Sequence, residues 1–169
     1  KLLLLERRGR GPQSLRHLPK PEALLDAWAE KHRLETYSMH RYYRWMTDLN
    51  ALAQTIGAIV EQQEASYAVT LTLGAMLRAP FVTQTEQIAL LLPERVDLKR
   101  LAADGRLQTA EDGYNVLLLT TRTEGPLQYR QKQDGLWVAS DLQLYLDLYA
   151  SAGRGREQAE HLRRERIGF

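Results

Sequence analysis

Four polar or charged residues near the C-terminus, Gln143, Tyr145, Asp147 and Arg154, have side chains that can form hydrogen bonds or ion pairs within one short stretch. Gln143 and Asp147 are four residues apart, so they are neighbours on the surface of a helix. Asp147 could accept hydrogen bonds from the backbone of the Gly-Arg-Gly turn around Arg154 and fix that turn. Alternatively, Asp147 and Arg154 could belong to one recognition surface.

The sequence lacks the patterns of the common catalytic centres. It has no cysteine, which excludes disulfides, thiol catalysis and cysteine zinc sites. Its glycines are too sparse to cradle a phosphate, and its serines lie in no nucleophile elbow. Asp141 and Asp147 are six apart on one predicted helix, so they cannot share a metal ion as the paired carboxylates of a nucleotidyltransferase do. The four histidines lack metal-ligand spacing: His17, His32, His40 and His161. We therefore expect no catalytic residue, no metal and no cofactor.

The first twenty residues are strongly basic. They contain six lysines or arginines and one glutamate, a net charge of +5, whereas the whole chain carries only +2 and the remainder is therefore acidic at −3. A basic segment on an acidic body is typical of a surface that meets nucleic acid. A solvated, flexible terminus would have the same composition. If this arm binds DNA, we expect the contacts to come from Arg7, Arg8, Arg10 and Arg16.

Residues 140–160 predict two helices joined at a glycine turn, and these helices would position the polar residues above. Ser140 and Gln143 match a capping box at the start of the first helix. Gly153 can take the left-handed conformation that ends a helix. The apolar residues recur at helical spacing over most of the circumference, which predicts a buried helix. They are Leu142, Leu144, Tyr145, Leu146, Leu148 and Tyr149.

The rest of the chain predicts helices and strands in alternation. Apolar spacing favours helices over residues 21–33, 48–61 and 97–103, with Trp28 in the core and residues 67–77 either helix or strand. Residues 40–45 interleave basic and aromatic side chains, which could stack on bases or lie half-buried in a sheet. Two hairpins are predicted around residues 111–113 and 133–135. The predicted strands cover residues 1–8, 34–45, 85–92, 107–110, 114–121, 127–131 and 136–139.

This order of elements predicts an α+β fold, in which helices pack on one face of a mostly antiparallel sheet and a helix pair closes the chain. We expect a basic arm over residues 1–20 and one α+β domain over residues 21–169. The chain starts without methionine, so we expect a fragment or a processed product whose upstream part is absent. No run approaches the ~20 apolar residues of a membrane span, which favours a cytoplasmic protein with no membrane partner.

Three stretches of this sequence resemble one family. The motif Q-L-Y-L-D-L from Gln143, followed after a short gap by G-R-G-x-E-x-A-E, resembles the C-terminal signature of AbiEi-type antitoxins. The stretches H-L-P-x-P-E-A-L-L-D-x-W-A from His17 and Y-A-V-T-L-T-L-G-A-M-L-R-A-P-F from Tyr67 are also similar. The family more usually has T-G at Thr70-Leu71 and S-P at Ser140-Asp141.

The resemblance implies a transcriptional regulator that is paired with a nucleotidyltransferase toxin in a bacterial type IV toxin–antitoxin, or abortive infection, system. In that family a winged helix-turn-helix precedes the C-terminal domain, so residues 1–8 would end its wing or link to it. The implied partners are DNA, through the basic arm and an upstream domain, and the toxin, which need not be bound directly. No oligomeric state is favoured. The alternatives are a DNA-binding regulator with a ligand-sensing or dimerisation domain and no toxin, and an enzyme that acts on nucleic acid.

Overall fold

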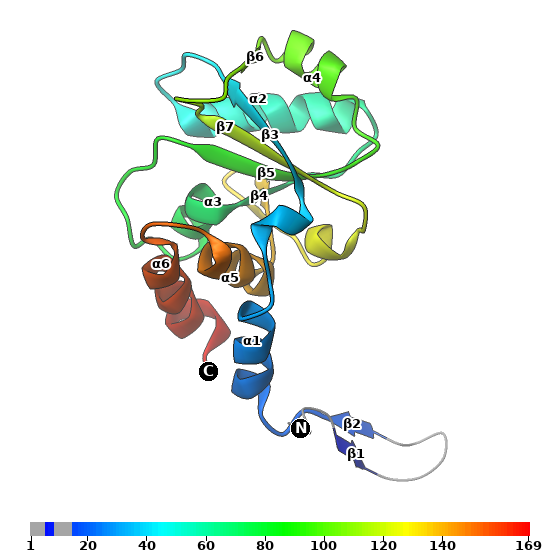
Figure 1. The fold of residues 1–169 in the computed structure, drawn as a ribbon, viewed down its shortest axis with the longest axis vertical. Helices are drawn as coiled ribbons and strands as arrows, with labels where there is room; N and C mark the ends of the chain where they lie inside the picture. The colour runs from blue at the N-terminus through cyan, green and yellow to red at the C-terminus, as the bar shows by residue number, and fades with distance from the viewer. Residues whose placement is uncertain (1–5, 9–14) are drawn as a thin grey trace.

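The computed structural model describes residues 6–8 and 15–169, and a mixed sheet lies at its centre (Figure 1). Among the described residues, seven strands form this sheet: β3 (Ser38–Tyr43), β4 (Ala68–Thr70), β5 (Ile88–Pro93), β6 (Gln108–Thr109), β7 (Val116–Thr121), β8 (Gln131–Gln133) and β9 (Leu136–Val138). Their order across the sheet is β6-β3-β7-β5-β4-β9-β8. The neighbouring pairs β4–β9 and β5–β7 are parallel, and the other neighbouring pairs are antiparallel.

Helices cover both faces of this sheet. Every residue of β5 and β7 is buried, and because successive side chains of a strand point to opposite faces, neither face of the sheet centre meets solvent. The expectation that helices pack on one face only is therefore wrong, although the α+β class is confirmed. In Figure 1, α2 and α4 lie on one side of β5, and α3, α5 and α6 lie on the other. The α-helices within the described residues are α1 (Pro21–Ala29), α2 (Leu49–Gln62), α3 (Leu71–Arg78), α4 (Leu98–Asp104), α5 (Asp141–Ala150) and α6 (Gly155–Leu162).

Local capping residues fix the ends of several helices as the sequence predicts. Asp48 accepts a hydrogen bond from the backbone N–H of Ala51 at the start of α2, and Asp97 caps α4 in the same way. Ser140 caps α5 through the N–H of Gln143 at 3.2 Å. Gly153 has a φ of +65° between α5 and α6, so the predicted helix pair and its glycine turn are confirmed.

One predicted hairpin is present and the other is absent. Strands β8 and β9 pair antiparallel around Asp134 and Gly135, whose φ angles of 49° and 82° match the positive values of a tight hairpin turn. By contrast, β6 and β7 do not pair with each other, because β3 lies between them and pairs with both. The hairpin around residues 111–113 is therefore wrong. The sequence signals that a turn occurs there, but it does not show that a distant strand enters the gap.

Residues 67–77, predicted as either helix or strand, contain both. Strand β4 ends at Thr70, and α3 begins at Leu71, which has a left-handed φ of +54°. A side chain in this conformation is strained by roughly 1–2 kcal/mol, which glycine avoids. This is the position at which the similar family more usually has glycine.

Helix α1 presents a different face to the core from the one predicted. Leu25 and Ala29 are its buried residues, whereas the side chain of Trp28 is 51% exposed, so the prediction of a core Trp28 is wrong. Leu142, predicted on the buried face of α5, is 42% exposed. The helices pack through neighbouring positions instead, and both side chains remain at the edge of the cleft described below.

A separate two-stranded sheet precedes α1 and extends away from the central sheet (Figure 1). Strand β1 (Glu6–Arg8) pairs antiparallel with β2 (Leu15–His17), and Arg7 lies opposite Arg16. The three described residues of the predicted 1–8 strand confirm it in part, and β2 was not predicted. Arg10 lies outside the described residues. In the described part of the chain, no helix has the length and apolar character needed to cross a membrane.

Candidate functional site

Asp147 lies at the centre of the C-terminal motif and has no solvent exposure. Helix α5 places it among apolar neighbours, since Leu144, Tyr145, Leu146 and Leu148 are buried as well. A carboxylate in such surroundings needs hydrogen-bond donors to replace the water that it has lost.

Four side chains of the described residues supply those donors, and they come from four parts of the chain. His32, after α1, donates from Nε2 at 2.8 Å to Oδ1 of Asp147, and the hydroxyl of Tyr37 donates to the same oxygen at 3.1 Å. Gln143 of α5 donates from Nε2 to Oδ1 at 2.8 Å. Thr70, at the end of β4, donates its hydroxyl to Oδ2 at 2.6 Å. We call these five residues the Asp147 cluster.

The hydrogen bonds of the Asp147 cluster define its protonation. A carboxylate that receives four donors is ionised and only accepts, so Nε2 of His32 carries a hydrogen. Nε2 of Gln143 donates its second hydrogen to the hydroxyl of Tyr37 at 3.0 Å. Burial raises the pKa of Tyr37 well above its ordinary range, and the negative charge of Asp147 raises it further. The cluster is therefore a closed network that ties α5 to the sheet and to the segment after α1.

These contacts differ from both sequence interpretations of Asp147. Its hydrogen bonds go to the core rather than to the Gly-Arg-Gly backbone, so it does not fix that turn. Nor does it share a surface with Arg154, which is exposed, lies 5.2 Å over the ring of Phe81 and pairs with Glu157 at 2.9 Å. Gln143 likewise spends its side chain on the cluster instead of closing the predicted capping box.

Tyr145 and Asp141 anchor the helix pair on either side of the cluster. The hydroxyl of Tyr145 lies 3.3 Å from Glu160 and accepts from Arg163 at 3.3 Å, and burial, aided by the charge of Glu160, raises the pKa of Tyr145 to about 12. Asp141 receives two hydrogen bonds from Arg78 at 2.8 and 3.0 Å. Asp141 and Asp147 therefore have separate partners, as their spacing predicts.

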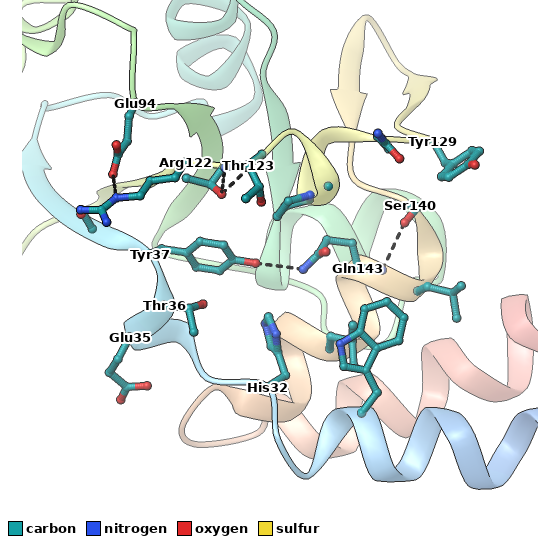
Figure 2. A pocket seen from close by; sticks show the side chains of 18 residues that line it. His32, Glu35, Thr36, Tyr37, Glu94, Arg122, Thr123, Tyr129, Ser140 and Gln143 are labelled. Atoms are coloured by element: carbon teal, nitrogen blue, oxygen red, sulfur yellow. Dashed lines mark hydrogen bonds and ion pairs between the residues drawn. The ribbon is translucent and has the colours of Figure 1, made fainter. Parts of the chain in front are cut away.

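A cleft of about 790 Å³ opens beside the Asp147 cluster. Figure 2 shows Tyr37, Gln143 and Ser140 on one side of it and Arg122, Thr123 and Tyr129 on another. His32, Tyr37 and Gln143 belong to both the cluster and the cleft. The wall consists of side chains from α1, α5, the segment before β3 and the segment after β7. It also includes Trp28, Glu35, Thr36, Ser38, Glu94, Thr121, Gly125, Pro126, Gln128, Leu142 and Leu146.

The basic–aromatic stretch before α2 is strand β3 with the residues that follow it, as one interpretation of residues 40–45 predicts. Its arginines have partners within the domain: Arg41 lies 5.5 Å over the ring of Tyr114, and Arg44 donates to the carbonyl of Gly105 at 2.9 Å. Trp45 is 76% exposed. Base stacking by this stretch stays a prediction.

Sequence reasoning missed His32, Tyr37 and Thr70. They lie far from Asp147 in the chain, and no motif joins them. The usable signal was Asp147 itself, because an aspartate inside a leucine-rich buried helix requires donors from elsewhere. Within the residues that the structure describes, no three histidine, aspartate or glutamate side chains are grouped so that they could hold a metal ion.

The fold and the motif agree with a known class of regulatory protein. The model of a family described as "Transcriptional regulator, AbiEi antitoxin, Type IV TA system" matches residues 17–167. The chain therefore belongs to the AbiEi antitoxin family, which is a family of transcriptional regulators rather than of enzymes. The resemblance of its motifs is confirmed by this match. No curated protein and no solved structure matches the chain.

Proposed function

We propose that this chain is part of an antitoxin that counteracts a nucleotidyltransferase toxin and represses its own operon in the cytoplasm. The observation that carries the proposal is the family match over residues 17–167, which spans the central sheet, the Asp147 cluster and the helix pair. In this division of labour, residues 1–20 form a basic DNA-binding arm and residues 21–169 form the antitoxin body.

The basic arm supports a DNA-binding role through its charge and its pairing. Arg7 and Arg16 are opposite each other in the β1–β2 sheet, so two basic residues share one short ribbon. Arginine contacts to phosphate fix a protein on the duplex without reading its sequence. Replacing Arg7, Arg8, Arg10 and Arg16 by alanine should weaken duplex binding and flatten its salt dependence by about 0.9 log units per lost phosphate contact. An unchanged slope would show that DNA binds elsewhere.

Arg154 is the motif residue best placed to meet a partner. Its guanidinium is exposed on the turn between α5 and α6, whereas Gln143, Tyr145 and Asp147 are engaged inside the domain. An exposed ion pair such as Arg154–Glu157 contributes little to folding stability. A loss of function on its removal would therefore reflect recognition rather than unfolding.

The test is growth rescue when the full-length protein is co-expressed with the nucleotidyltransferase encoded beside it. We expect the unmodified protein to restore growth, and Arg154→Ala to abolish rescue at an unchanged melting temperature. Arg95→Ala is the matched control, because Arg95 forms a similar exposed ion pair with Glu124 at 2.9 Å. Failure of the unmodified protein to rescue growth would refute the antitoxin role. Full rescue by Arg154→Ala would return this residue to a structural role.

The cleft beside the Asp147 cluster favours a second candidate function, a ligand-sensing DNA-binding regulator without a toxin partner. Its volume of about 790 Å³ lies within the range of roughly 300–1,000 Å³ found for small-molecule sites. Operator binding that responds to a small molecule, without any growth rescue, would support this function over the antitoxin role.

A further inference from the structure

The polar groups that the cleft offers to a ligand are mainly hydrogen-bond acceptors. Oε1 of Gln143 accepts no hydrogen bond from any described residue, and it is absent from the buried atoms that lack partners, so it is accessible to solvent. The orientation of this amide is fixed, because Nε2 donates both its hydrogens to Tyr37 and Asp147. Nδ1 of His32 is likewise an acceptor, since Nε2 donates to Asp147.

The charge of the cleft does not favour a phosphate or carboxylate ligand. Arg122 is the one basic residue among the described lining residues, apart from the histidine in the cluster, and it pairs with Glu94 at 3.2 Å. Glu35 also lines the cleft and has no ion-pair partner among the described residues. The lining therefore leaves an uncompensated negative charge, which repels anions and suits a neutral ligand with N–H donors.

Flat and apolar side chains complete the wall. The indole of Trp28 is half-exposed, and Leu142 is 42% exposed, although both lie on helices whose other faces are buried. Tyr129 is 85% exposed at the cleft. An exposed aromatic ring beside a fixed acceptor is suited to a planar ring system, which can stack on the aromatic face while its edge donates hydrogen bonds.

We propose that this cleft binds a small, uncharged, planar nitrogen heterocycle that carries N–H donors, such as a purine base or nucleoside. Trp28 supplies the stacking surface, and Oε1 of Gln143 accepts from the edge of the ring. The site needs no rearrangement of the Asp147 cluster, because Oε1 of Gln143 is not used within it. This inference does not depend on the antitoxin role, and growth rescue is not its readout.

The experiment is calorimetric titration of the folded protein with adenosine and with guanosine. We expect saturable binding, and we expect Trp28→Ala to weaken it roughly tenfold, as for the loss of one stacked base. Trp45→Ala is the matched control, because Trp45 is a more exposed tryptophan that does not line the cleft. Leu142→Arg should abolish binding by filling the cleft. Thermal melts close to that of the unmodified protein would show that both cleft variants are folded.

Two further ligands test the chemistry of recognition. A dimethylated adenosine, whose exocyclic nitrogen carries no hydrogen, should bind more weakly than adenosine if Oε1 of Gln143 accepts from that group. AMP should bind no more tightly than adenosine, because the cleft lacks a free cation among its described residues. The proposal is overturned if neither nucleoside binds at millimolar concentration, if Trp28→Ala binds as well as the unmodified protein, or if AMP binds much more tightly.

Discussion

Replacing Asp147 by alanine tests whether the motif is first a structural element. The substitution removes the acceptor of four side-chain donors and leaves them beside a small cavity. His32 and Gln143 border the cleft and can be rehydrated. Thr70 is fully buried and Tyr37 is 6% exposed, so their hydroxyls lose their partner without access to bulk water.

The expected magnitude follows from those two hydroxyls. A buried donor that is left without a partner costs about 1–3 kcal/mol. Two such groups give a loss of about 2–6 kcal/mol, which is a large share of the ~5–15 kcal/mol that stabilises a typical domain. Asp147→Asn should cost less. Its oxygen can replace Oδ1, and the Thr70 hydroxyl can rotate to accept from the new amide.

Urea unfolding followed by circular dichroism measures these losses. For each variant, the midpoint should fall while the slope with denaturant stays constant, which indicates a change in stability alone. A double-mutant cycle with Thr70→Val isolates the hydroxyl–carboxylate contact, since the second substitution should cost much less once Asp147 is alanine. A loss under 1 kcal/mol for Asp147→Ala would refute the closed network. Additive losses in the cycle would refute the contact with Thr70.

Three further outcomes follow from the structure. Leu146→Ala should cost about 2–5 kcal/mol in urea unfolding, because Leu146 is buried, whereas Leu142→Ala should cost far less. Leu71→Gly should be at least as stable as Leu71→Ala, the reverse of the usual order, because glycine relieves the left-handed φ. The pKa of Tyr145 is about 12 in the folded state against an ordinary value of 10.0, so stability should fall as the pH rises from 10 to 12. Tyr145→Phe should make that fall shallower, and an unchanged fall would contradict the assignment.

Local signals in the sequence predicted the elements whose ends are set by their own residues. Asp48, Asp97 and Ser140 start helices because each side chain accepts from a backbone N–H a few residues later, and that bond needs no tertiary contact. The β8–β9 turn is equally local, since Asp134 and Gly135 tolerate positive φ. The hairpin around residues 111–113 failed because the insertion of β3 between β6 and β7 depends on a distant strand.

The site was predictable only in its centre. The motif singled out Gln143 and Asp147 as partners at i and i+4, and their hydrogen bond at 2.8 Å confirms that pairing. Thr70 and Tyr37 approach Asp147 from 77 and 110 residues away, which no local pattern encodes. Trp28 was assigned to the core on its size alone. Helix rotation decides its fate, and the rotation is set by Leu25 and Ala29, which pack inward instead.

Gln143 connects the structural and the proposed ligand-binding parts of this domain. Its amide hydrogens stabilise the Asp147 cluster, and its oxygen faces solvent at the cleft. A ligand that donates to this oxygen would polarise the amide and strengthen its two donated hydrogen bonds. Binding should therefore stabilise α5 against the sheet, by about 2.7 kcal/mol at a ligand concentration a hundredfold above the dissociation constant. Adenosine should accordingly raise the melting temperature of the unmodified protein and leave that of Trp28→Ala nearly unchanged, whereas equal shifts in both would place the ligand outside the cleft.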